Sequence, residues 1–233
     1  MLESFLLYGA PGSGKTTLAL TAPKPLLLID VDNKTFTKEM GLDIKSISAR
    51  LSSDSLRNKI LLGGKLLKQP EGYLQLCDFL SSLEEDCPYE TIVLDSLTKV
   101  VEHLKRLILF IGKTPIMRIQ DWGTLLSNLE ELIGVLLSLD CKQVILIAHD
   151  TIEKDEVTGG IEFRPLVEGS MRHKIGAYFN EVYYLKPMKG GEKGQIIYSM
   201  LTQNDGKHIS RTARELPIQE EMTFEDILKA KKK

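Results

Sequence analysis

The feature of this sequence that most constrains its fold is a glycine-rich loop near the N-terminus. The loop has the pattern G-x-x-x-x-G-K-[ST] and consists of Gly9, Ala10, Pro11, Gly12, Ser13, Gly14, Lys15 and Thr16. It follows an apolar run, 5–8, and leads into a helix-forming segment. The glycines let successive backbone N–H groups point at a phosphate chain, and the helix adds the positive end of its dipole. This strand–loop–helix context predicts a binding site for a nucleoside triphosphate.

Two side chains of the loop are expected to take part in the chemistry. Lys15 can reach the β- and γ-phosphates of a nucleotide, and the Thr16 hydroxyl can bind Mg²⁺. The backbone of the loop and of Thr17 is expected to contact the phosphates. We therefore expect a nucleoside triphosphate and Mg²⁺ to bind at this loop. The alternative, a chance match in a polar glycine-rich loop, does not explain the apolar run in front of it.

The composition is that of an ordinary folded domain with a full hydrophobic core. The chain has 233 residues, of which 42% are hydrophobic and 27% charged, and this length suits one α/β domain. The formal net charge of −2 provides no general attraction to nucleic acid or anionic membranes, so such binding would need a local patch. The three cysteines lack metal-ligand spacing. With no signal-peptide pattern and no membrane-spanning apolar run, we expect a cytoplasmic protein without a membrane partner.

The order of secondary-structure elements indicates a mainly parallel sheet. Strands are expected at four apolar runs, 4–8, 25–32, 91–96 and 141–148. Helices are expected at 15–22, 74–83, 97–111 and 121–139. Continuous apolar runs of this kind are typical of parallel strands that helices cover on both faces. Within 33–70 the pattern is weaker, because 44–47 alternates like an edge strand and 56–67 reads as a helix interrupted by two glycines.

The C-terminal part of the chain has a different pattern. A loop or hairpin, a short helix and two antiparallel strands are expected at 151–167, 171–177, 181–186 and 195–201. An acidic amphipathic segment, 219–230, packs either on its own domain or on a partner. The chain is therefore expected to divide into a core, 1–215, and a C-terminal segment, 216–233, that ends in a lysine tail.

A second acidic position is expected to complete the metal site. The largely apolar run 91–94 ends on Asp95, which is the Walker B pattern, and it places a carboxylate at the sheet edge that also carries Lys15. We therefore expect Asp95 to bind Mg²⁺ together with Thr16. The alternative, that this acid only caps the following helix, describes Ser96 better than Asp95.

Two further strand ends carry candidate catalytic groups. Asp30 and Asp32 both end the second strand and, because side chains alternate along a strand, they point to the same face. One of them is well placed to orient or deprotonate the attacking water, and the sequence alone does not separate them. His149 ends the strand at 141–148, where it could hydrogen-bond the γ-phosphate. The alternative is a structural histidine.

Taken in sequence order, these motifs resemble the core of RecA-type ATPases. The pieces are the phosphate loop, the run 29–32, the strand end 94–96, and the run 147–149 followed by a loop. More closely, the chain resembles small phage-encoded RecA-like ATP-binding proteins of single-strand annealing and recombination, over about residues 3–215. The resemblance implies a RecA-like P-loop NTPase core: a mainly parallel sheet with helices on both faces and antiparallel C-terminal edge strands. It also implies a location in the host cytoplasm if a phage encodes the protein.

The resemblance implies roles for individual residues. Asp32 occupies the position of the family's catalytic carboxylate, beside Lys15, Asp95 and His149. That carboxylate is commonly glutamate, so the shorter aspartate implies a differently held water or slow turnover. The resemblance further implies rings or filaments with ATP at the subunit interface, where a basic residue of the neighbouring subunit completes the site. The candidates for this basic residue are Lys207, Arg211 and Arg214, and the alternative is a solvated surface.

A DNA-binding surface is also implied by the resemblance, which places the loop 150–169 against DNA. This loop contains six acidic residues and only two basic ones, Lys154 and Arg164. Since phosphate neutralisation dominates non-specific DNA affinity, this charge is unfavourable. The candidate contacts with single-stranded DNA are Phe163, Arg164, Arg172 and Lys174. The alternative is that the loop contacts a partner protein.

Three functions are compatible with the site. The first is a DNA-stimulated ATPase that promotes recombination or single-strand annealing as a homo-oligomer, with single-stranded DNA and a single-strand-binding protein as partners. The second is a small-molecule (nucleotide) kinase, which would need several arginines around the transferred phosphoryl group, and arginine is sparse here. The third is a nucleotide-gated replication or packaging accessory factor. For the RecA-type core, the strand before His149 should lie between the first strand and the strand that ends on Asp95.

Overall fold

The computed structural model describes residues 2–32, 43–46, 69–154, 159–189, 196–217, 219–220 and 223–233. The helix expected at 56–67 lies outside the described residues. The edge strand expected at 44–47 is present as β3 (Asp43–Ser46). The first helix, expected at 15–22, is shorter and ends at Ala19, because turns follow directly after it.

The centre of the fold is a sheet whose described strands have the order β10-β9-β8-β1-β5-β4-β2-β3. The strands are β1 (Glu3–Tyr8), β2 (Leu26–Asp30), β3, β4 (Thr91–Asp95), β5 (Gln143–Ala148), β8 (Glu181–Lys189), β9 (Ile196–Leu201) and β10 (Gln219–Glu220). All pairings among β1, β2, β3, β4, β5 and β8 are parallel, whereas β8–β9 and β9–β10 are antiparallel. The expected parallel sheet with antiparallel C-terminal edge strands is therefore confirmed.

The position of β5 decides the type of P-loop fold. Ile147 of β5 pairs with Leu7 of β1 on one side and with Asp95 of β4 on the other. The strand before His149 thus separates the strand that enters the phosphate loop from the strand that ends on Asp95. This is the order expected for a RecA-type core, and direct pairing of β1 with β4 would have excluded it.

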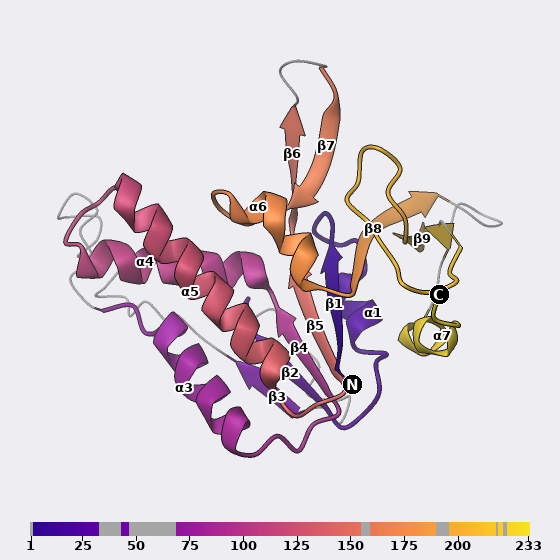
Figure 1. Ribbon diagram of the computed structural model, residues 1–233, viewed down its shortest axis with the longest axis horizontal. Coiled ribbons are helices and arrows are strands. Elements are labelled where there is room, and N and C mark those ends of the chain that lie inside the picture. Colours follow the sequence, from indigo (N-terminus) through magenta and orange to yellow (C-terminus); the bar gives the residue numbers. More distant parts are fainter. Residues whose placement is uncertain are drawn as a thin grey trace.

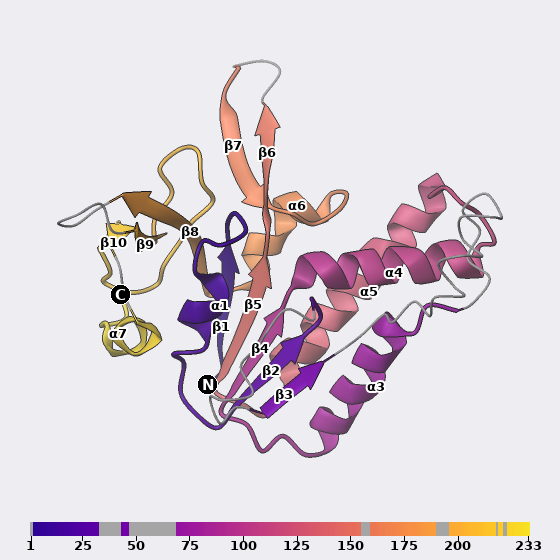
Figure 2. The same ribbon diagram turned by 180° about the vertical axis from the view of Figure 1, so that it is seen from behind.

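Helices cover both faces of the sheet, as Figure 1 and Figure 2 show. The helices are α1 (Lys15–Ala19), α3 (Gly72–Glu85), α4 (Leu97–Ile111), α5 (Ile119–Ser138), α6 (Met171–Lys174) with the 3-10 turn η2 (Ile175–Tyr178), and α7 (Phe224–Lys229). Alternation along β1 divides the core in two, because successive side chains point to opposite faces. Leu6 and Tyr8 belong to the cluster that includes α3, α4 and α5, whereas Phe5 and Leu7 pack with α1 and α7.

A two-stranded hairpin projects from the carboxyl edge of the sheet (Figure 1). It consists of β6 (Asp150–Lys154) and β7 (Ile161–Pro165), which pair antiparallel. Only His149 separates the end of β5 from the start of β6. The hairpin is one of the two structures expected over 151–167, and it is attached directly to a strand end that carries a candidate catalytic residue.

The C-terminal segment packs on its own domain. The ring of Phe224 in α7 lies edge-on to Phe5 in β1, with 4.7 Å between the ring centroids. The backbone N–H of Phe224 donates to Oγ1 of Thr21 at 2.9 Å. Since Phe224 and Ile227 are fully buried, this segment contributes to the same core as α1.

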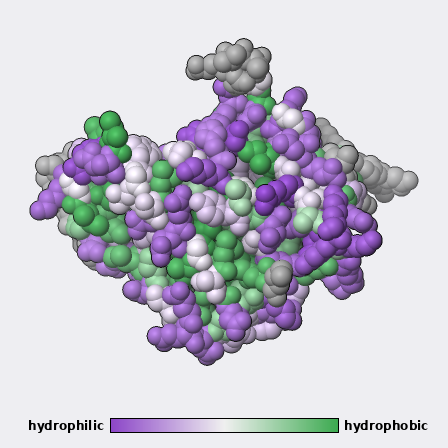
Figure 3. All heavy atoms as spheres, in the orientation of Figure 1, coloured by the Kyte–Doolittle hydropathy of each residue, from purple (hydrophilic) through white to green (hydrophobic). Residues whose placement is uncertain are grey.

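Hydrophobic side chains reach the surface at the turn between α4 and α5, as Figure 3 shows. Ile111, Ile116 and Ile119 are 69%, 72% and 91% exposed there. These three isoleucines form a small group at the turn between α4 and α5, which is far from the phosphate loop (Figure 1). Among the described residues, no helix is both long enough and apolar enough to cross a membrane.

Candidate nucleotide site

The phosphate loop connects β1 to α1 at the carboxyl edge of the sheet, as its sequence predicts (Figure 2). Gly14, the N-cap of α1, has a φ of 88°, which favours glycine. A Cβ atom at Gly9 would lie 2.2 Å from the carbonyl oxygen of Leu185 in β8. The backbone conformation therefore favours glycine at position 14, and close packing requires glycine at position 9.

The ammonium group of Lys15 is held inside the loop. Its Nζ atom donates to the carbonyl oxygens of Gly9 at 2.8 Å and Ala10 at 2.7 Å, and to Oγ of Ser13 at 3.2 Å. Lys15 is only 6% exposed. Because a charged phosphate oxygen is a stronger partner for an ammonium group than a neutral carbonyl, this arrangement suits the exchange of loop contacts for phosphate contacts.

Thr16 and Asp95, the two expected Mg²⁺ ligands, are in direct contact. The Thr16 hydroxyl donates to Oδ2 of Asp95 at 2.5 Å. Burial raises the pKa of Asp95, and the neighbouring carboxylates Asp32 and Asp30 raise it further, whereas the hydrogen bond from Thr16 and the charge of Lys15 act in the opposite direction. A cation at this position would relieve the crowding of negative charge.

The donor set of this contact fits Mg²⁺. A hydroxyl and a carboxylate are hard oxygen ligands, and Mg²⁺ is typically bound by one or two such groups plus phosphate oxygens and water. Within the described residues there is no group of three histidine, cysteine or acidic side chains that could hold a metal by itself. Thr16 and Asp95 are therefore suited to a metal that arrives with a nucleotide.

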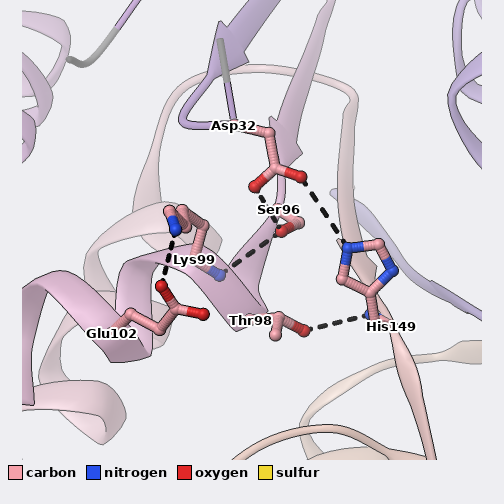
Figure 4. Close-up of a pocket in the computed structure, with 6 residues that line it drawn as sticks. All are labelled: Asp32, Ser96, Thr98, Lys99, Glu102 and His149. Atoms are coloured by element: carbon pink, nitrogen blue, oxygen red, sulfur yellow. Dashed lines mark hydrogen bonds and ion pairs between the residues drawn. The ribbon is translucent and has the colours of Figure 1, made fainter. Parts of the chain in front are cut away.

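A small cavity of about 130 Å³ lies at the carboxyl ends of β4 and β5 (Figure 4). It is lined by Asp32, Ser96, Thr98, Lys99, Glu102 and His149. Oδ1 of Asp32 accepts a hydrogen bond of 3.0 Å from Ser96, and its Oδ2 lies 3.7 Å from Nε2 of His149. The structure thus brings two of the sequence-predicted catalytic residues together.

The two acids that the sequence leaves open occupy different positions. Asp30 is the last residue of β2, pairs in register with Asp95 and is only 2% exposed. Asp32 follows the strand and lines the cavity. Only Asp32 is therefore placed to meet a water molecule in that cavity.

Sequence reasoning missed the contacts by which two residues, Ser96 and Thr98, hold these groups in place. Oγ of Ser96 accepts from the Lys99 backbone N–H at 3.3 Å, as an N-cap should, and it also donates to Asp32. Oγ1 of Thr98 accepts from the His149 backbone N–H and donates to the Leu166 carbonyl, both at 3.0 Å. The cap was readable from the sequence, but the contacts to Asp32 and His149 span the fold and leave no local signal.

The three candidates for an intersubunit basic residue lie in different environments. Arg214 is 2% exposed, forms an ion pair with Glu3 and lies 3.5 Å from Glu181. It is thus a structural residue that joins the C-terminal segment to the sheet, and the expectation of an intersubunit role does not fit its position. Arg211 is exposed and donates to the Phe179 carbonyl, and Lys207 is exposed in the turn after β9.

Three of the four candidate DNA contacts are engaged within the chain. The Phe163 ring stacks on His208, with 4.6 Å between centroids and 16° between planes. Arg164 lies 2.9 Å from Glu153, and Arg172 lies 2.7 Å from the same carboxylate. Lys174, in contrast, is exposed at the end of α6. These contacts offset part of the acidic charge of the hairpin.

The fold and the site together define a P-loop NTPase. The sequence matches the family described as AAA domain over residues 3–211. Because this match covers most of the chain, the protein belongs to the AAA domain family. Among curated proteins, none matches this chain in sequence.

Several solved structures are similar to this chain at low sequence identity. The RadB recombinase has a TM-score of 0.44 and 14% identity, with 86% of this chain and 87% of that chain covered. The flagellar accessory protein FlaH from Methanocaldococcus jannaschii has a TM-score of 0.42 and 12% identity, with coverage of 85% and 76%. A KaiC-like protein from Pyrococcus horikoshii OT3 has a TM-score of 0.40 and 13% identity, with coverage of 85% and 77%.

Proposed function

We propose that the protein is an ATPase that binds ATP with Mg²⁺ and acts in DNA recombination or single-strand annealing. One observation carries the catalytic part: Lys15, the Thr16–Asp95 contact and the Asp32–His149 pair converge at one edge of the sheet. These groups correspond to the parts that phosphoryl transfer to water needs, namely a phosphate ligand, metal ligands and a group that orients water.

Each residue of the site has one task in this proposal. The loop backbone and Lys15 bind the phosphates, and Thr16 with Asp95 holds Mg²⁺, which neutralises charge on the phosphoryl oxygens when it is bound. Asp32 orients the attacking water and accepts its proton. Ser96 fixes the carboxylate of Asp32 by its hydrogen bond. His149, beside Asp32, contacts the γ-phosphate.

The partners belong to the same proposal and rest on the resemblance in motif order. The protein forms a homo-oligomer, a ring or a filament, with ATP at the subunit interface. Lys207 or Arg211 of a neighbouring subunit then completes the site. Single-stranded DNA contacts the region of the hairpin and α6, where Lys174 is exposed, while Arg164 and Arg172 exchange Glu153 for phosphate.

The test is phosphate release from ATP with and without single-stranded DNA. We expect Mg²⁺-dependent release that rises with DNA and is abolished by Lys15→Ala. Lys24→Ala, which removes an exposed lysine outside the loop, is the matched control and should keep full activity. ADP formation that requires an added nucleoside monophosphate would identify a kinase instead. Tight ATP binding with negligible release under both conditions would favour an accessory factor.

A further inference from the structure

Tyr198 lies against the phosphate loop without being part of it. The residue belongs to β9 and is 44% exposed. A Cβ atom placed on Gly14 would lie 3.0 Å from Cδ1 and 3.1 Å from Cγ of Tyr198. The aromatic ring thus rests on a loop residue that has no side chain and no room for one.

The alternation of side chains along β8 and β9 explains how the ring reaches the loop. Leu185 pairs with Met200, and Pro187 pairs with Tyr198. Leu185 and Met200 are buried in the cluster that includes α1. Because residues two apart on a strand share a face, Tyr198 continues this apolar face beyond its covered part, to the point where α1 begins.

An exposed aromatic side chain is by itself common and needs no function. The position of Tyr198 is more specific, because Gly14 is the residue directly before Lys15 and is the N-cap of α1. Within the part of the chain that the structure describes, the Tyr198 hydroxyl has no hydrogen-bond partner and no other aromatic ring packs on it. The ring is therefore available to a ligand that leaves the loop on this side.

We propose that Tyr198 is the surface on which the base of the bound nucleoside triphosphate stacks. The inference rests on the proposed nucleotide binding and adds base recognition to it. The loop backbone and Lys15 bind phosphates only, so this part of the site does not distinguish ATP from inorganic triphosphate. An aromatic ring stacks on every base, and on the larger purines best. The site accordingly prefers purine over pyrimidine nucleotides and separates ATP from GTP only weakly.

The experiment measures the affinity of the full chain for three ligands by titration calorimetry in the presence of Mg²⁺. The ligands are ATP, CTP and inorganic tripolyphosphate. Tyr198→Ala should weaken ATP binding about tenfold, equivalent to about 1.4 kcal/mol, and CTP binding by less. Its affinity for tripolyphosphate should stay within about twofold of the wild type, because the phosphate contacts are intact.

Two control variants keep the inference falsifiable. Tyr198→Phe preserves the ring and should bind ATP like the wild type. Met188→Ala removes another side chain of the β8–β9 ribbon, 39% exposed, that lies on the other face and should change nothing.

The remaining outcomes would overturn the inference. Equal weakening of ATP and tripolyphosphate by Tyr198→Ala would show that the ring only supports the shape of the loop. Unchanged ATP binding would show that the base lies elsewhere. Failure of the wild-type protein to bind either ligand would overturn the proposed function as well, so the two failures are distinguishable.

Discussion

The Thr16 hydroxyl donates a 2.5 Å hydrogen bond to Oδ2 of Asp95, although β1 and β4 are not neighbours in the sheet. The contact joins the start of α1 to the end of β4 across the end of β5. The sheet order therefore brings the two expected metal ligands together without any local sequence connection between them. In the same strand order β5 lies next to β4, and His149, which follows β5, lies beside Asp32.

Asp95→Asn should remove Mg²⁺-dependent hydrolysis, with a loss in kcat of about hundredfold or more.

Folding raises the pKa of Asp95, chiefly by burial, so its ionised form is less stable in the native protein than in the unfolded chain. The stability contribution of this group falls as the pH rises above its unfolded pKa. The neutral variant should thus be at least as stable as the wild type at pH 7, measured by urea unfolding without nucleotide. A large loss of stability would contradict this.

Asp32→Ala should lower kcat by about 10²–10⁴-fold, the usual contribution of a positioned base. Ser96→Ala should lower kcat by about tenfold with KM unchanged, because the carboxylate of Asp32 loses its orientation. Steady-state phosphate release measures both. Ser96→Thr keeps a hydroxyl and should recover most of the activity. If Ser96→Ala changes stability but not kcat, the serine serves only as the cap of α4.

Glu153→Ala should strengthen single-stranded DNA binding by about tenfold at low salt, because it releases Arg172 and removes one of the two acidic partners of Arg164, the other being Glu162. The affinity should also become more dependent on salt, and a salt titration of fluorescence anisotropy measures both effects. Glu225→Ala removes the same charge from an exposed site in α7 and should have a much smaller effect. No change in DNA affinity with Glu153→Ala would favour a protein partner for the hairpin.

The buried His103 should make the stability depend on pH. Burial lowers the pKa of His103 from 6.5 to about 4, and the positive charges of Arg106 and Lys99 act in the same direction. Below pH 6.5 the ring becomes charged in the unfolded chain but stays neutral in the native protein. The contribution of His103 to the free energy of unfolding is therefore fully present above pH 6.5 and decreases below it. It should fall by on the order of 3 kcal/mol as the pH decreases towards 4.

Urea unfolding at pH 7, 6, 5 and 4 would measure this loss. In His103→Leu, which fills a similar volume without a titratable group, the free energy of unfolding should change much less with pH. His173→Leu removes a half-exposed histidine and should keep the wild-type dependence. Parallel curves for the wild type and His103→Leu would contradict the assignment.

Phe224→Ala should destabilise the protein by about 3–5 kcal/mol, the usual cost of removing a buried phenylalanine. Phe224 is fully buried and its ring packs on Phe5. Thermal unfolding measures the change, with Lys229→Ala on the exposed side of α7 as control. A change below about 1 kcal/mol would show that the C-terminal segment detaches from the core in solution.

The sequence was sufficient for the elements whose signal is local. Each of these elements can be recognised from a short stretch of sequence. They are the glycine loop, the apolar runs before Asp32, Asp95 and His149, and the amphipathic helices. Together with the motif order they predicted that the strand before His149 lies between the first strand and the strand that ends on Asp95, and the structure has this order. The N-cap at Ser96 was also readable, because a cap depends on the next three residues only.

The sequence was insufficient where distant segments meet. Arg214 reads as an exposed basic residue, yet its partners Glu3 and Glu181 come from β1 and β8. Phe163 reads as a free aromatic residue, yet His208 stacks on it. In both cases the deciding contact is created by strand pairing between remote parts of the chain, which periodicity does not encode.

The N-terminal end of the described chain lies at the far end of β1 from the phosphate loop, and an ion pair links the C-terminal end to it. Glu3 begins β1 and forms an ion pair with Lys232, and the Lys233 backbone N–H donates to the Ala213 carbonyl at 2.8 Å. A strand of this length spans about 17 Å. An affinity tag, a fluorophore or a surface tether attached near the Glu3 end of β1 would therefore leave the nucleotide edge and the hairpin accessible. The protein can therefore be immobilised for binding and single-molecule experiments without circular permutation of its chain.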